Sequence, residues 1–147
     1  MYDELDSQII ELLKEDARYS VRKLAVKLNV SPATVAARIV KLEKNRIILG
    51  YEAAVDYSKL DRDFIALTEL TIRKGALLEV QKKIAMMPGV EAVYDVTGNS
   101  DSMALCRCKN RTEYSALVKK ILAIENVERA NTHVILNVIK ENGRMKV

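Results

Sequence analysis

The sequence of 147 residues predicts an α+β fold in two parts, three helices followed by a βαββαβ unit. Two observations lead to this prediction. Apolar residues recur at helical spacing as far as Ile48, and beyond it strand-like runs alternate with two further helical segments. A hydrophobic content of 49% is enough for one fair core or two small ones.

The first two helices are predicted from their apolar faces. The face of the first is made of Leu5, Ile9, Leu12 and Leu13, and that of the second of Val21, Leu24, Ala25 and Leu28. Asp3 is a suitable N-cap for the first helix, and Glu4 and Asp6 are favourable near its positive end. We therefore expect two short amphipathic helices before residue 29.

The stretch Asn29-Val30-Ser31-Pro32 interrupts the helical pattern. Ser31 is suited to cap backbone amides, and Pro32 fits the first helical position, where its missing amide proton costs nothing. The third helix therefore begins at Pro32. Its predicted buried face is Val35, Ile39 and Leu42, which leaves five residues pointing away from the core: Ala33, Thr34, Ala37, Arg38 and Lys41.

Positive charge is concentrated in these last two helices. Residues 18–46 contain eight Lys or Arg and the single acid Glu43, a net charge of +7, whereas the rest of the chain carries −3. Two helices joined by a three- or four-residue turn form a helix-turn-helix unit, whose second helix reads base edges in the major groove. A basic helix face is often merely solvated, but here charge, turn spacing and capping agree. We predict contacts with double-stranded DNA from Arg22, Ser31, Ala33, Thr34, Ala37, Arg38 and Lys41.

After Ile47 the pattern changes to an extended arm and a polar linker, with the boundary near residues 58–63. Strands are then expected at residues 64–72, 90–96, 102–108 and 132–139, with helices carrying Leu77, Val80, Ile84 and Met87 and then Tyr114, Leu117, Ile121 and Ile124. A helix, a short break and Val-Glu occur at Pro88–Glu91 and again at Glu125–Glu128. This repeat indicates two βαβ halves, a four-stranded antiparallel sheet with both helices on one face.

In the first and last predicted strands, apolar residues occur at the positions that face either side of the sheet. Two helices cover one face of a sheet, so the other face is expected to pack against a second copy. The resulting homodimer would pair two helix-turn-helix units, as palindromic DNA requires.

The whole pattern resembles the Lrp/AsnC family of leucine-responsive, or feast/famine, transcriptional regulators. The resemblance is carried by Asp3, Asp6, Ile9, Leu13, Asp16, Ala17, Arg18, Leu24, Ala25, Leu28, Ser31, Val35, Arg38, Leu42, Glu43 and Ile48. It implies a winged helix-turn-helix DNA-binding domain at 1–50, a β arm and linker at 51–63, and a ferredoxin-like effector-sensing and oligomerisation domain at 64–147. It also implies assembly of dimers into tetramers or octamers.

An amino-acid effector is expected at the turn Gly98, Asn99, Ser100 and Asp101. Gly98 permits close backbone approach, Asp101 is suited to accept an ammonium group, and nearby amides suit a carboxylate. The alternative is an ordinary turn, for which these residue types are usual. The resemblance adds Thr132 and His133, which open the last strand.

Two positions depart from the family pattern. Arg46 stands where a glycine commonly closes the recognition helix, so the neighbouring Asn45 is expected to take the left-handed conformation. In the turn, Asn99 and Ser100 replace an acid and an aromatic residue, which implies a weak or altered effector preference.

Other classes of function are less favoured. No paired acids, catalytic triad or phosphate-binding loop accompanies the only histidine, so no catalysis and no cofactor are expected. Cys106 and Cys108 lack further ligands for a metal and are expected to be buried thiols. Phe64 is the only phenylalanine, which disfavours base stacking on an RNA-binding sheet. An architectural DNA-binding protein without an effector stays as the alternative. No run spans a membrane, and the acidic start is unlike a signal peptide, so a cytoplasmic protein is expected.

Overall fold

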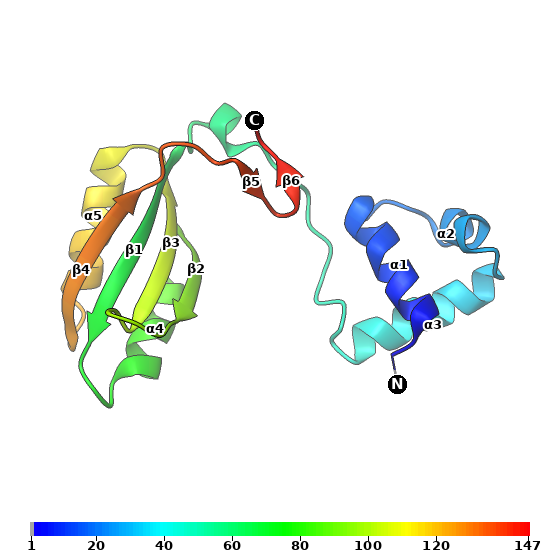
Figure 1. Ribbon diagram of the computed structural model, residues 1–147, viewed down its shortest axis with the longest axis horizontal. Coiled ribbons are helices and arrows are strands. Elements are labelled where there is room, and N and C mark those ends of the chain that lie inside the picture. The colour runs from blue at the N-terminus through cyan, green and yellow to red at the C-terminus, as the bar shows by residue number, and fades with distance from the viewer. Residues whose placement is uncertain (1) are drawn as a thin grey trace. The chain divides into compact units, whose positions relative to one another are not determined.

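The computed structural model describes residues 2–147 (Figure 1). The chain divides into two compact units, of which the first ends at Val55 and the second is Asp56–Val147. The division falls inside the segment 51–63 that was expected to be arm and linker. Each unit has its own hydrophobic core.

The first unit consists of three helices, α1 (Glu4–Glu15), α2 (Val21–Leu28) and α3 (Pro32–Lys44). Each begins after a side-chain cap, supplied by Asp3, Ser20 and Ser31 respectively. Their apolar faces meet in one core of Ile9, Leu24, Ala25, Val35 and Leu42. The helix-turn-helix arrangement predicted from the break at residues 29–32 is confirmed.

The turn between α2 and α3 is closed by backbone geometry. Asn29 adopts the left-handed conformation with φ 54°, and the amide of Val30 donates to the Ala25 carbonyl oxygen at 3.1 Å. Asparagine tolerates this conformation better than most residues do. The chain therefore turns sharply after α2, and α3 begins at Pro32.

The end of α3 differs from the prediction. Arg46, not Asn45, takes the left-handed conformation, with φ 56°, whereas Asn45 has φ −81°. The amides of Ile47 and Ile48 both donate to the Leu42 carbonyl oxygen, at 2.9 and 3.2 Å, and Ile48 packs against the core. Packing of Ile48 thus fixes where the chain turns, and the strain falls on Arg46.

The wing and the β arm do not form strands within the described chain. Residues 49–56 have no helix or strand, and the short helix η1 (Tyr57–Leu60) follows them. A strand requires a neighbouring strand to share its backbone hydrogen bonds. No described residue pairs with this segment as a strand, so it has no regular secondary structure.

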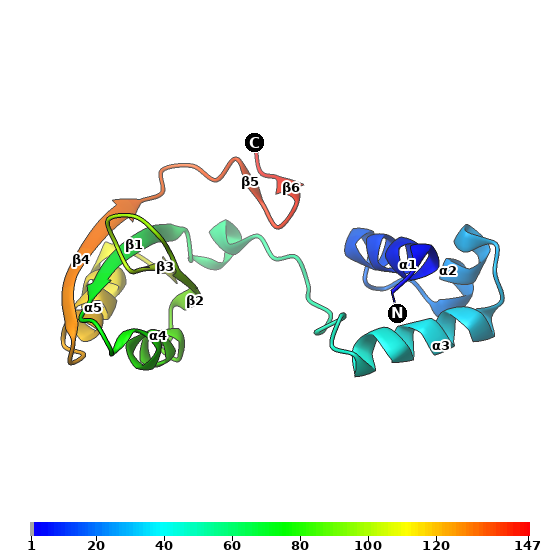
Figure 2. The same ribbon diagram turned by 60° about the horizontal axis from the view of Figure 1, so that its bottom comes forward.

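The second unit is built on a four-stranded antiparallel sheet in the order β2-β3-β1-β4. Its elements are β1 (Phe64–Ile72), α4 (Leu77–Ala85), β2 (Val90–Asp95), β3 (Ser102–Cys108), α5 (Arg111–Leu122) and β4 (Val127–Val134). In Figure 2, α4 and α5 lie on the same side of the sheet. The ferredoxin-like βαββαβ fold predicted from the sequence is confirmed.

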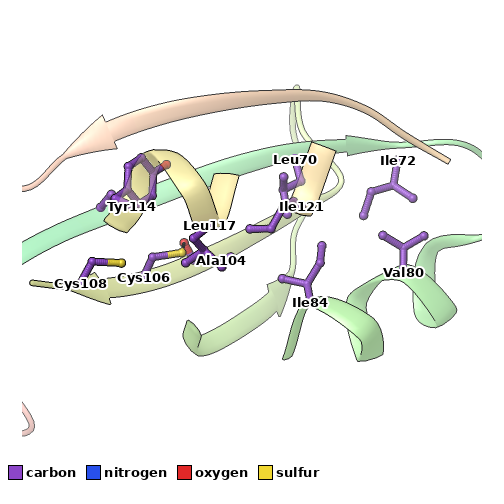
Figure 3. Packing of buried hydrophobic residues seen from close by; sticks show 11 residues of the cluster. Leu70, Ile72, Val80, Ile84, Ala104, Cys106, Cys108, Tyr114, Leu117 and Ile121 are labelled. Carbon is purple, nitrogen blue, oxygen red and sulfur yellow. Dashed lines mark hydrogen bonds between the residues drawn. The ribbon is translucent and has the colours of Figure 1, made fainter. Parts of the chain in front are cut away.

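The core of this unit lies between the sheet and its two helices. Figure 3 shows Leu70 and Ala104 of the sheet facing Ile84 of α4 and Ile121 of α5. The thiols of Cys106 and Cys108 lie in the same layer and are free. Alternate residues of the central strands therefore point into the core, and the residues between them, such as Leu67 and Leu105, point to the uncovered face.

The last strand lies earlier than predicted. β4 is Val127–Val134, not residues 132–139, and it pairs with β1 from Ala66↔Val134 to Ile72↔Val127. The Val-Glu repeat indicated this start, but the apolar run at residues 135–139 suggested a later strand. That run leaves the sheet after Ile135, and a short hairpin of β5 (Lys140–Glu141) and β6 (Arg144–Met145), which was not predicted, follows it.

A buried arginine stands on the face of the sheet opposite the helices. Arg107 donates to Glu91 of β2 at 2.6 Å and to Glu141 of β5 at 2.9 Å, and its guanidinium lies 4.7 Å from the ring centroid of Tyr57 in η1. The linker helix and the C-terminal hairpin are thus both attached to β3.

None of the helices in the described part of the chain has the length and apolar character needed to cross a membrane.

Candidate DNA-binding surface and effector site

The exposed face of α3 is made of small residues, one valine and two lysines: Ala33, Ala37, Val40, Lys41 and Lys44. At about 100° per residue these positions cluster on one side of the helix, away from Leu42. Three of the predicted contacts, Ala33, Ala37 and Lys41, belong to this face. Val40 and Lys44 were not predicted as contacts, although their spacing from Ala33 and Ala37 follows the same helical period.

Ser31 and Thr34 are joined to each other at the start of α3. The Ser31 hydroxyl oxygen accepts the Thr34 amide at 3.1 Å, and the two hydroxyl oxygens lie 2.8 Å apart. Ser31 is exposed and Thr34 is half-buried. Their hydroxyl groups therefore stabilise the first turn of α3, where a helix also presents free backbone amides to an anion.

Arg38 does not lie on the exposed face, and the expectation that it points away from the core is wrong. Its side chain is 29% exposed and donates to Asp6 at 3.2 Å and also to the carboxylate of Asp3. At about 100° per residue, Arg38 is only about 40° from the buried Leu42. The hydrogen bonds that Arg38 donates to Asp3 and then to Asp6 raise the pKa of Arg38, and Arg38 lowers the pKa of Asp3.

The neighbouring helix α2 adds further positive charge. Arg22, Lys23 and Lys27 are all exposed on it. The ammonium groups of Lys23 and Lys27 lie 4.3 and 5.1 Å from the ring centroid of Tyr19, an arrangement that holds both lysines on one side of the helix. With Lys41 and Lys44 of α3, they give the two helices of the helix-turn-helix five exposed basic residues.

The turn at Gly98–Asp101 connects β2 to β3 and is held to β1. Gly98 has φ 116°, a conformation that favours glycine. The amide of Asp101 donates to the Leu70 carbonyl oxygen at 2.9 Å, and its carboxylate accepts the Ile72 amide at 2.8 Å. Since the register of β1 and β4 shifts between Thr71 and Ile72, Asp101 stabilises a bulge.

Thr132 and His133 lie on opposite faces of the sheet. The Thr132 hydroxyl is 2.7 Å from that of Tyr114, which is 2.8 Å from the hydroxyl of Thr68, so Thr132 belongs to the helix-covered side. His133 pairs with Glu69 on the other face, with 3.3 Å between Nε2 and the carboxylate. The predicted effector residues are therefore not all brought together.

A polar cluster connects His133 with the turn. Asn131 donates to Glu69 at 3.1 Å, and hydrogen bonds from Asn131, His133 and Ser100 hold the pKa of Glu69 below its ordinary value. Glu69 and Asn131 were not among the predicted site residues. Glu69 carried a usable signal, because it is the one charged residue within an apolar strand. In the described chain no three His, Cys, Asp or Glu side chains are grouped to hold a metal ion.

Comparison with known proteins covers both units. The AsnC-type helix-turn-helix domain matches residues 3–43, and the Lrp/AsnC ligand binding domain matches residues 65–145. The chain is 38% identical to an HTH-type transcriptional regulator of Pyrococcus abyssi over 146 residues, which is 99% of each chain.

Solved structures show the same fold. LrpC of B. subtilis is 28% identical and has a TM-score of 0.84, with 95% of this chain and 98% of that chain covered. A transcriptional regulator of Neisseria meningitidis, solved as its L-Met complex, is 23% identical and has a TM-score of 0.88, with 96% and 94% covered. With both domains matched in order along nearly the whole chain, this protein belongs to the Lrp/AsnC family of transcriptional regulators.

Proposed function

We propose that this protein regulates transcription by placing α3 in the major groove of double-stranded DNA, two copies of the chain acting as a homodimer. The observation that carries the proposal is the exposed face of α3. Small side chains at Ala33 and Ala37 allow close approach of the helix to base edges, and Lys41 and Lys44 follow where the helix would meet phosphates. In this proposal Arg22, Ser31 and Thr34 contact the DNA backbone.

The test is recovery of bound fragments from genomic DNA, followed by affinity measurements over a range of salt. For a protein that neutralises several phosphates, the logarithm of the binding constant should fall linearly with the logarithm of the salt concentration. The slope should be steeper by about 0.9 for each phosphate contact. Replacing Lys41 and Lys44 together by Gln should make this slope less steep by the amount expected for about two phosphate contacts. Binding that does not depend on salt would contradict the proposal.

The alternative is an architectural DNA-binding protein without an effector. It would also bind DNA with a strong salt dependence, so affinity alone does not separate the two functions. A regulator should bind its recovered fragments about a thousandfold or more tightly than random DNA. A ratio near one would favour the architectural function.

We propose further that an amino acid or a related small molecule modulates the protein. The match to a ligand binding domain supports an effector, and the relative solved with L-Met supports its chemical class. Glu69, with Asn131, His133 and the turn from Gly98 to Ser100, offers a carboxylate for an ammonium group. The carboxylate of Asp101 accepts the Ile72 amide and so stabilises the adjoining end of β1.

Titration calorimetry of the purified protein against the twenty amino acids tests this second proposal. We expect at least one to release heat and to change DNA affinity, and Glu69→Gln to weaken that response. Glu128→Gln removes the same charge from the neighbouring strand β4 and should leave the response unchanged. No heat and no change in DNA affinity with any amino acid would argue against an amino-acid effector.

A further inference from the structure

We infer that Arg38 is a positioning residue of the DNA-binding surface: paired with Asp3 and Asp6, it fixes α3 against the start of α1 and does not itself contact DNA. The inference rests on the proposed function, because it concerns how α3 is held for its task. It reverses the role that the sequence suggested, since arginine is the residue most often used to read guanine.

The carboxylates of Asp3 and Asp6 each use their two oxygen atoms for two different partners. One oxygen of each closes the capping box of α1: Asp3 accepts the Asp6 amide at 3.0 Å, and Asp6 accepts the Asp3 amide at 3.1 Å. The other oxygen of each accepts a hydrogen bond from Nη1 of Arg38. A single nitrogen of α3 thus bridges both halves of the cap of α1.

Burial explains why this pairing should persist when DNA is present. The Asp6 side chain is only 1% exposed. A buried carboxylate is strongly unfavourable without a paired charge, and Arg38 supplies that charge. If Arg38 turned away to reach a base or a phosphate, Asp6 would stay buried without this partner. Contact between Arg38 and DNA would therefore weaken the packing of α1 on α3.

The local charge also favours a structural role. With Asp3 and Asp6 against it, Arg38 adds no net positive potential at its place on α3. The positive charge on α2 and α3 comes from five other exposed residues, Arg22, Lys23, Lys27, Lys41 and Lys44. The attraction of α3 to DNA does not depend on Arg38.

The substitution Asp3→Asn distinguishes the two roles by the sign of its effect. Asparagine caps helices as well as aspartate does, so α1 should still begin at the same residue. If Arg38 positions α3, the ratio of affinities for recovered and random DNA should fall about two- to tenfold. If Arg38 reads DNA, its release from Asp3 should leave this ratio unchanged or raise it, and the inference would be overturned.

Glu11→Gln is the matched control for the loss of charge. It removes one negative charge from the same helix, where Glu11 pairs only with Lys14 at 2.8 Å in the contacts described. The ratio should not change in this variant. Using a ratio of affinities cancels the general gain in DNA attraction that any lost carboxylate brings.

A second experiment compares Arg38→Gln with Arg22→Gln in the full-length protein. A positioning residue should lower specific affinity without changing the salt slope, whereas Arg22→Gln should lower the slope by about 0.9. In an Asp6→Asn background, Arg38→Gln should have little further effect on DNA affinity. If the salt slope of Arg38→Gln were less steep by about 0.9, as for one lost phosphate contact, the inference would be overturned. If Arg38→Gln does not fold, the result with Asp3→Asn decides the question. Failure of the unmodified protein to bind DNA would instead refute the proposed function.

Discussion

The carboxyl group of Asp3 has a lowered pKa because Arg38 and then the Asp6 amide donate hydrogen bonds to it. A carboxyl group whose pKa is lower in the folded state adds stability above its unfolded pKa, ordinarily 3.8. That stability is lost as the pH falls through the lower, folded value. The contact between α1 and α3 should therefore weaken in acid.

We expect the thermal unfolding temperature of the first unit to be nearly constant from about pH 7 to about pH 5 and to fall below about pH 4. Other carboxyl groups titrate in the same range, so the informative quantity is the difference between the protein and Asp3→Asn, followed by circular dichroism. The variant should be less stable at neutral pH, and the two should converge in acid. A constant difference at every pH would show that the charge of Asp3 is not involved.

Cys106 is a thiol that should be inert. It is fully buried beside Ala104 and Thr68, and burial raises its pKa to about 11. The reactive species is the thiolate, which is scarce at neutral pH when the pKa is high. We expect a thiol reagent at pH 7 to label the folded protein far more slowly than the protein in urea. Rapid labelling of the folded protein would show that the core of the second unit opens readily.

At the scale of elements, Arg107 joins four segments of the second unit: η1, β2, β3 and β5. Its side chain is 6% exposed, and its two glutamate partners are about a third exposed or less. Arg107→Met should lower the free energy of unfolding by about 1–3 kcal/mol, less than the cost of breaking a fully buried pair, because water still reaches the glutamates.

Urea denaturation measures this effect, and Arg111→Met is the matched control. Arg111 is the exposed first residue of α5, so its replacement should change stability by no more than about 0.5 kcal/mol. Equal effects from the two substitutions would mean that the attachment of η1 and β5 to the sheet contributes little.

At the scale of the whole molecule, the face of the sheet opposite α4 and α5 carries apolar side chains that neither helix covers. Leu67 and Leu105 stand opposite each other on that face, with Met103 nearby, and all three are only half-buried. Apolar residues grouped on an exposed face are typical of an interface. We therefore expect the protein to be at least a homodimer through this face, and stacking into tetramers or octamers stays a prediction.

Leu105→Asp should break this dimer, because a carboxylate would be buried in an apolar interface. Light scattering at micromolar concentration should then give the mass of one chain. Leu122→Asp places the same charge on α5, on the opposite side of the unit, and should leave the dimer intact. A dimer that survives Leu105→Asp and separates with Leu122→Asp would place the interface on the helices.

The sequence by itself determined the order and kind of nearly all elements. Apolar periodicity located α1, α2 and α3, the break at Asn29 and Ser31 located the turn, and the Val-Glu repeat indicated the two βαβ halves. These signals are local, because caps and amphipathic faces are set by residues three or four apart. For the same reason the family was recognised from the chain alone.

The tertiary structure decided what depends on partners far apart in the chain. Arg38 is half-buried and ion-paired because Asp3 and Asp6, at the start of α1, lie beside it in the fold. In the sequence they are 35 and 32 residues away from it. Arg46 took the left-handed conformation because Ile48 packs on the core. The strand pairing fixed which alternation of β1 faces outward, and with it placed Glu69 beside His133. Local spacing carries no information about such contacts, since they exist only once the elements have packed together.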